Sequence, residues 1–228
     1  MGKLIVSLTS WKKRIGNAHI TIESILNQTR KADSVELNLD YENFPNGLAD
    51  LPDSITELEK DGKIKIFFEE KDLKVYEKIY PTIHRHKDES VTIVTLDDDV
   101  NYPATYLEEI EKNLTNSDWL CTKDNAWTMG QYMAYGPMAV KALERWLNSD
   151  LMLNVPLDDY AIFFILRRYN LIRGQKINSS CEDRQQGNSF RRLFVTGYNE
   201  DELKDTTCNY PEEEFQREFQ YIKSIGLF

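Results

Sequence analysis

Short apolar runs alternate with helix-like segments along roughly the first 120 residues. Four runs have the apolar content or the alternation of buried strands, at 4–8, 34–39, 64–68 and 91–96. Helices are predicted between them, at 19–27, 54–60 and 72–84. Because helical crossovers join parallel strands, this order predicts an α/β domain with a mainly parallel central sheet flanked by helices.

The pattern changes after residue 99. Helices are predicted at 103–114, 139–147 and 158–169, whereas 119–137 is aromatic and irregular and the tail after residue 178 is polar. The sequence contains no internal repeat and no flexible linker. One two-part domain therefore fits the chain better than two independent domains.

Composition and charge exclude some classes of function. Of the 228 residues, 41% are hydrophobic and 29% are charged, which is typical of a globular chain. The net charge of −10 argues against nucleic acid as a partner, because a groove for a polyanion needs clustered Lys and Arg. The sequence has no signal-peptide pattern and no apolar run of the roughly 20 residues that a transmembrane helix needs. Three cysteines without metal-ligand spacing (Cys121, Cys181 and Cys208) favour a reduced, cytoplasmic compartment.

Three consecutive aspartates follow the most apolar predicted strand. Ligands of open α/β sheets bind outside the carboxyl ends of the strands, which is where Asp97, Asp98 and Asp99 lie. Adjacent carboxylates repel one another, and a hard divalent cation such as Mn²⁺ or Mg²⁺ would relieve this repulsion. Asp97 and Asp99 can face the same side of an extended segment while Asp98 points elsewhere. On the triplet alone, a solvated turn is the alternative.

Several segments resemble known enzymes in their order along the chain. The segment 94–99 (VTLDDD) resembles the Asp-x-Asp signature of glycosyltransferases with the GT-A fold. The segment 6–15 (VSLTSWKKRI) is similar to the first strand and loop of a group of bacterial and viral enzymes that resemble family 2. The segments 73–81 (LKVYEKIYP) and 156–160 (PLDDY) resemble two further elements of this group. The resemblance covers residues 4–169.

The resemblance implies a single GT-A (Rossmann-like) domain in two halves. Residues 1–100 would bind the nucleotide-sugar donor, and residues 101–228 would bind the acceptor and carry catalysis. The implied donor is a nucleoside-diphosphate sugar, with UDP preferred, and the acceptor is a glycan or glycoconjugate. Because such enzymes often extend lipid-linked glycans, peripheral membrane contact stays open.

The resemblance also assigns residues to the donor. Thr9, Ser10 and Arg14 have groups suited to hydrogen-bond the nucleotide, and Trp11 offers a stacking face. The alternative for Trp11 is that it closes the edge of the domain. Asp40 matches the place where GT-A enzymes often bind the base, although a lone Asp before a loop more often forms a turn.

The acidic run and a lysine complete the predicted donor site. Asp97 and Asp99 are the expected metal ligands, and Asp97 and Asp98 are expected to contact the nucleotide. Lys74 and Lys78 are four residues apart, so a helix would place them on one face. The resemblance favours Lys78 as the partner of the diphosphate, and solvated lysines are the alternative.

An acidic pair before a late helix offers a general base. An inverting transfer needs a carboxylate that takes the proton of the acceptor hydroxyl. The resemblance places this role on the second acid of the pair, so we expect Asp159 before Asp158. The alternative is that these carboxylates only cap the helix. All three histidines precede the acidic run, which favours inversion, because many retaining relatives use a late histidine as a metal ligand.

Two other functions stay open. A sugar-phosphate nucleotidyltransferase would use a similar scaffold and Mg²⁺, but it normally has a Gly-rich first loop, whereas the loop 9–16 has a single glycine. A non-catalytic carbohydrate-binding protein could share the fold. The aromatic segment 119–137 would suit a sugar pocket, although a core role for most of its side chains is the more common case.

Overall fold

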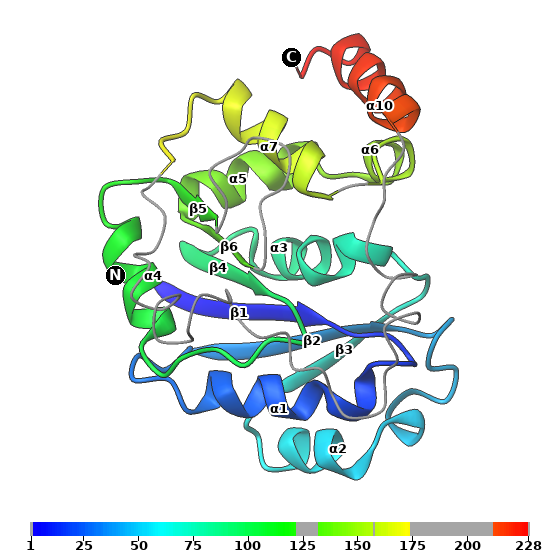
Figure 1. Cartoon of the computed structure of the whole chain (residues 1–228), viewed down its shortest axis with the longest axis vertical. Coiled ribbons are helices and arrows are strands. Elements are labelled where there is room, and N and C mark those ends of the chain that lie inside the picture. The colour runs from blue at the N-terminus through cyan, green and yellow to red at the C-terminus, as the bar shows by residue number, and fades with distance from the viewer. Residues whose placement is uncertain (1, 122–131, 157, 174–211, 228) are drawn as a thin grey trace.

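Six strands form one sheet in the computed structural model, which describes residues 2–121, 132–156, 158–173 and 212–227 (Figure 1). The strands lie in the order β3-β2-β1-β4-β6-β5. Their bounds are Lys3–Thr9 (β1), Ser34–Asp40 (β2), Lys65–Glu69 (β3), Val91–Leu96 (β4), Trp119–Cys121 (β5) and Tyr132–Tyr135 (β6).

The first four strands are parallel, as predicted. β1 pairs with β2 and β4, and β2 pairs with β3, always in parallel. β6 then pairs antiparallel with β4, and β5 with β6. The predicted α/β fold with a mainly parallel sheet is therefore confirmed.

Helices cover both faces of this sheet (Figure 1). Those described are α1 (Ile15–Leu26), η1 (Gly47–Asp50), α2 (Asp53–Lys60), η2 (Lys74–Lys78), α3 (Tyr80–His86), α4 (Tyr106–Leu114), α5 (Pro137–Trp146), α6 (Ser149–Asn154), α7 (Asp158–Arg168) and α10 (Glu212–Ser224), with η marking 3₁₀ helices. α1 and α2 lie on one face, and α3, α5 and α7 lie on the other. None of the helices in these ranges is both long and apolar enough to cross a membrane.

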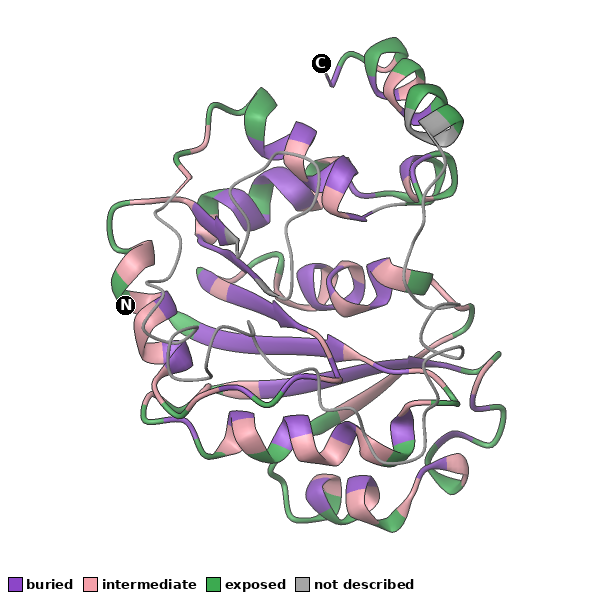
Figure 2. Cartoon of the chain, viewed as in Figure 1, coloured by how far each residue is buried: buried purple, intermediate pink, exposed green. Residues whose placement is uncertain are grey.

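The central strand β1 supplies both layers of the core. Side chains alternate along a strand, so Leu4, Val6 and Leu8 pack into the layer of α1 and α2. Ile5 points the other way, into the layer that holds Ile93 of β4 and the buried faces of α3, α5 and α7. Figure 2 shows the resulting buried interior on both sides of the sheet.

Two expectations about secondary structure were wrong. The segment 119–137 is not irregular throughout, because it contains β5 and β6, whose short runs are too brief to show a period. The segment 72–84 is not one helix, because η2 ends at Lys78 and α3 begins at Tyr80. Pro81 has no N–H to donate to the carbonyl of Glu77, so an α-helix cannot run through it unbroken.

Lys74 and Lys78 therefore do not share a face. A 3₁₀ helix has three residues per turn, so residues four apart point in different directions. Lys74 is exposed and has a positive φ of 56°, whereas the side chain of Lys78 is only 18% exposed.

The sequence pattern did not indicate α6 and α10. Both pack onto the same layer as α7, through Leu151 and Ile222 respectively.

Candidate active site at the carboxyl ends of the parallel strands

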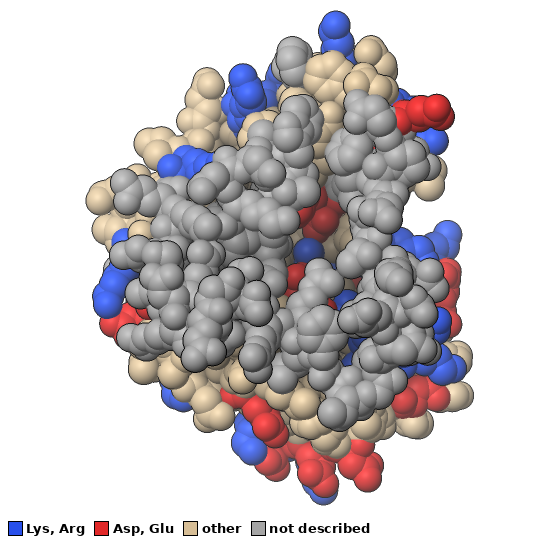
Figure 3. Space-filling view, in the orientation of Figure 1, with Lys and Arg blue, Asp and Glu red and all other residues tan. Residues whose placement is uncertain are grey.

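A cavity of about 500 Å³ opens beside the carboxyl ends of β1 and β4. Its lining includes eight of the residues expected from the sequence: Thr9, Ser10, Trp11, Arg14, Lys78, Asp97, Asp98 and Asp99. Figure 3 shows acidic and basic side chains meeting in a hollow of this face. The structure thus brings together the first loop, the lysine of η2 and the acidic run, which the sequence separates widely.

Asp98 holds the first loop against the acidic run. Its carboxylate is buried, accepts a hydrogen bond from Ser10 Oγ at 2.6 Å and pairs with the Arg14 guanidinium. Thr21 of α1 donates to the backbone carbonyl of Asp98 at 2.8 Å. Burial raises the pKa of Asp98 to about 6, although Arg14 and Ser10 oppose this shift. The contacts of Asp98 are internal ones, and its expected contact with a nucleotide stays a prediction.

Asp97 and Asp99 present carboxylates to the cavity. Their side chains are 31% and 18% exposed, and both line it. Arg14 also reaches Asp99 at 2.9 Å. The hydroxyl of Tyr102 accepts the backbone N–H of Asp97 at 3.0 Å, which fixes the turn after β4. Two carboxylates on an open cavity suit a hard divalent cation that keeps coordination positions for phosphate.

Lys78 connects the acidic run to α7. Its ammonium lies 3.7 Å from an oxygen of Asp97 and 3.3 Å from an oxygen of Asp158. Burial lowers the pKa of Lys78, but Asp158, Asp97 and Asp159 outweigh this effect and hold the pKa above its ordinary value. Lys78 is therefore a fixed positive charge between the two carboxylate groups.

Asp158 and Asp159 form the first turn of α7. Asp158 is buried and bound by Lys78, whereas Asp159 is half-buried. Neither lines the cavity directly. The charge of Asp159 nevertheless acts on the same centre, since it contributes to the raised pKa values of Lys78 and Tyr135. The structure thus brings the acidic pair next to the residues that line the cavity.

Asp40 lies at the end of β2, where its carboxylate accepts two hydrogen bonds from Asn43. One bond comes from the backbone N–H at 2.6 Å and one from the side-chain amide at 2.8 Å. Asn43 lines the cavity, whereas Asp40 does not. The turn-forming role is thus observed, and a contact with a base stays a prediction.

Trp11 lines the cavity and is half-buried. The Lys13 ammonium lies 5.2 Å from the centroid of its ring. A half-buried aromatic ring beside a cavity can offer a face to a base, so the predicted stacking role is compatible with the position of Trp11.

Sequence reasoning missed Glu77, which precedes Lys78 in η2. Its side chain is 3% exposed, and Thr9 Oγ1 donates to one of its oxygens at 2.9 Å. Burial, together with Asp40, Asp72 and Glu69, raises the pKa of Glu77 to about 8, although Thr9 opposes the shift. The sequence carried little signal for this role, because a glutamate between Tyr76 and Lys78 is also typical of a solvated helix face.

The aromatic segment 119–137 is described in part. Trp119 and Tyr135 are buried in the core, which is the role that the composition favoured. Residues 122–131, with Trp127 and Met129, lie outside the described residues, as do Cys181 and Cys208.

Comparisons with known proteins give matches of structure only. No family model and no curated protein matches the chain. S. aureus TarS 1–349 matches with a TM-score of 0.57 and 10% identity over 77% of this chain and 58% of that chain. The same fragment in complex with UDP-GlcNAc matches with a TM-score of 0.54 and 11% identity over 89% and 64%. The chain therefore spans less than two thirds of these TarS structures.

Cytidylyltransferases share the fold as well. One from Leptospira borgpetersenii serovar Hardjo-bovis matches with a TM-score of 0.52 and 10% identity over 98% of this chain and 94% of that chain. Similarity at this identity establishes the fold alone. The chain therefore has the α/β fold that TarS and this cytidylyltransferase share.

Proposed function

We propose that the chain is a metal-dependent glycosyltransferase, which moves a sugar from a nucleoside-diphosphate sugar to a hydroxyl of a glycan or glycoconjugate. One observation carries the proposal: Lys78 joins Asp97, in the donor cavity, to Asp158, beside the candidate base. A diphosphate, a transferred sugar and an acceptor hydroxyl need these groups within one site. UDP is the first nucleotide to test, since the similar TarS fragment was solved with UDP-GlcNAc.

The donor would lie in the cavity with its diphosphate toward Lys78 and Arg14. Both side chains line the cavity and carry the positive charge that a diphosphate requires. Asp97 and Asp99 would hold Mn²⁺ or Mg²⁺, which supplies further neutralisation of the leaving diphosphate. The nucleotide base of the donor would lie along the first loop, beside Trp11 and Thr9.

Asp159 would act as the general base. Its carboxylate accepts the proton of the acceptor hydroxyl as the hydroxyl oxygen attacks the anomeric carbon. The bond from this carbon to the diphosphate oxygen breaks on the opposite face, and the nucleoside diphosphate leaves with the electron pair. The configuration of the sugar is thereby inverted. Asp158 is a weaker candidate because the Lys78 ammonium already engages its carboxylate.

A nucleotidyltransferase is the second candidate, since the Leptospira cytidylyltransferase matches almost the whole chain. The first loop argues against this function. A loop that cradles triphosphate needs free backbone N–H groups. Here, the N–H groups of Arg14 and Ile15 both donate to the carbonyl of Trp11, at 2.8 and 2.9 Å.

Product analysis separates the two candidates. With Mn²⁺ and a panel of nucleoside-diphosphate sugars, we expect slow release of nucleoside diphosphate without any acceptor. With nucleoside triphosphates and sugar 1-phosphates, we expect no release of pyrophosphate. Pyrophosphate release would instead identify a nucleotidyltransferase, and neither product would be the result expected of a non-catalytic carbohydrate-binding protein.

The assignment of Asp159 as the general base is tested by the substitution Asp159→Asn. The substitution keeps the shape of the side chain and removes its ability to accept a proton, so transfer should fall on the order of 10²-fold or more. Donor affinity, measured by calorimetry with Mn²⁺, should stay within a few-fold. The matched control is Asp150→Asn on the exposed face of α6, which should transfer normally. Normal transfer by Asp159→Asn would place the base elsewhere.

A further inference from the structure

We propose that Asp40, Asp72 and Glu77 form a second cation site, which binds a hard divalent cation such as Ca²⁺. This site is separate from the Asp97–Asp99 run and does not depend on the proposed transfer reaction. The three residues come from different segments, namely the end of β2, the loop after β3 and η2.

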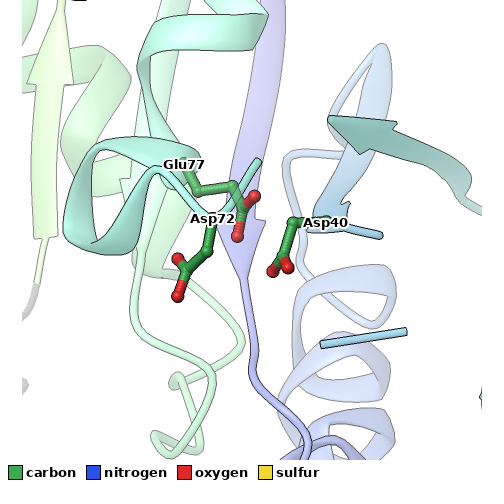
Figure 4. Close-up of side chains that lie close together, drawn as sticks. All are labelled: Asp40, Asp72 and Glu77. Carbon is green, nitrogen blue, oxygen red and sulfur yellow. The ribbon is translucent and has the colours of Figure 1, made fainter. Parts of the chain in front are cut away.

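The first observation is the convergence of the three carboxylates. One oxygen from each residue lies within 4.8 Å of the other two, and Figure 4 shows the Glu77 carboxylate between Asp72 and Asp40. Two ligands of one ion can be separated by at most twice the metal–oxygen distance. Ca²⁺ binds oxygen at about 2.3–2.6 Å, so oxygens that lie within 4.8 Å of one another are close enough to share one such ion with small side-chain shifts.

The second observation is an unsatisfied buried oxygen. Glu77 is 3% exposed, and its Oε1 has no hydrogen-bond partner among the described residues. Its other oxygen is already fixed by Thr9. A buried carboxylate oxygen without a donor is costly, and the Glu77 carboxyl group lies beside those of Asp40 and Asp72. A cation at the centre of the three groups supplies the missing partner.

The neighbouring groups leave the cluster electronegative. The Lys74 ammonium pairs with Asp72, but this lysine is 75% exposed, and it is one positive charge against the three carboxylates that are present once Glu77 loses its proton, above about pH 8. The remaining contacts are neutral, since Asp40 accepts both of its described bonds from Asn43. All the offered ligand atoms are oxygens, which selects hard cations over the softer transition metals.

A cation bound by these three residues would link several segments that line the proposed donor cavity. It would join the ends of β2 and β3 to η2, and Thr9 would extend the link to β1 through Glu77. Lys78 follows Glu77 directly and contacts Asp97. The cation would therefore act as a positioning element for η2, without contact to the reacting atoms.

The test uses the full chain, CaCl₂ and no nucleotide. At CaCl₂ concentrations about 100 times Kd, the melting temperature of the unchanged protein should rise by roughly 5–10 °C. Glu77→Gln should weaken calcium binding at least tenfold in titration calorimetry and abolish this rise. The matched control is Glu70→Gln, which makes the same change at a nearby exposed glutamate and should bind like the unchanged protein.

Two further variants test whether the calcium response comes from this site and not from the Asp97–Asp99 run. Asp72→Asn alters a half-buried residue and should also lose the calcium response, so it replaces Glu77→Gln if that variant does not fold. Asp99→Asn should keep the response, because it alters the other carboxylate group. The inference is overturned if calcium stabilises Glu77→Gln and Asp72→Asn as it does the unchanged protein, or if Asp99→Asn alone removes the response. None of these outcomes bears on transfer activity, which is measured separately.

Discussion

Single residues decide how charge is arranged in this cavity, and Lys78 is the clearest case. Its ammonium is shared by Asp97 and Asp158, which lie far apart in the sequence. The sequence allowed us to predict that residues 97–99 and 158–159 are candidate site residues, because adjacent carboxylates at the ends of strands and helices often contact ligands. Their connection was not predictable, because it depends on the three-dimensional placement of η2.

We predict that Lys78→Met destabilises the protein by about 3 kcal/mol, because it removes the ammonium that pairs with the buried carboxylate of Asp158 and with Asp97. Urea unfolding measures the change. Lys74→Met, which makes the same change at an exposed lysine, should stay within about 0.5 kcal/mol of the unchanged protein.

The double variant Lys78→Met/Asp158→Asn provides the internal check. Removing the second charge of the pair should recover part of the loss, because the uncompensated carboxylate is then gone. Strictly additive losses would show that Lys78 and Asp158 do not interact.

At the scale of elements, two features escaped sequence reasoning for physical reasons. The break between η2 and α3 follows from Pro81, a local signal whose effect was underestimated. α10 is an amphipathic helix within an acidic tail, and its buried face becomes apparent only when Ile222 and Phe219 pack onto the core. Apolar strands such as β4 were predictable, because strands buried on both faces are rich in β-branched and apolar residues.

Glu218 makes α10 sensitive to pH. The residue is fully buried, and neither carboxylate oxygen has a hydrogen-bond partner among the described residues. Burial raises its pKa from 4.5 to about 7. As pH rises from 4.5 to 7, the unfolded chain releases this proton before the folded protein does, so the free energy of unfolding falls. The shift corresponds to at most about 3 kcal/mol.

We therefore predict that Glu218→Gln is more stable than the unchanged protein at pH 8 and nearly equal to it at pH 4. Urea unfolding at both pH values measures the difference. Glu213→Gln, at an exposed position of the same helix, should leave the pH dependence as it is. An equal effect of Glu218→Gln at both pH values would contradict the role of the buried carboxyl.

At the scale of the whole molecule, the two halves of the chain share one sheet. β6 pairs with β4, and one core layer combines Ile5 and Ile93 with Ala139 and Ile162. Alternating strands and helices made the α/β class predictable, whereas the antiparallel edge was not, because β5 and β6 are very short. The expected division into donor and acceptor halves describes roles in a proposed reaction and does not define folding units.

We predict that the intact chain unfolds in a single cooperative transition and that residues 1–100 alone do not fold. Without β6 and α5, the fragment would expose one face of β4 and β1, together with an unpaired edge of β4. Far-UV circular dichroism and tryptophan fluorescence should give coincident transitions for the intact chain. Two separated transitions, or a folded fragment, would contradict this prediction.

The strict alternation along β1 also constrains the length of this segment. One residue added within the strand would exchange the two layers, so that Leu8 and its neighbours would face the layer in which Ser7 now bonds Asn38 and Thr82. The same insertion would move the first loop along the sheet and separate Ser10 from Asp98. The exposed turn at Asp61 and Gly62 carries no such double constraint. Insertions and deletions should therefore accumulate in such turns, while the distance from Lys3 to Arg14 is preserved to the residue.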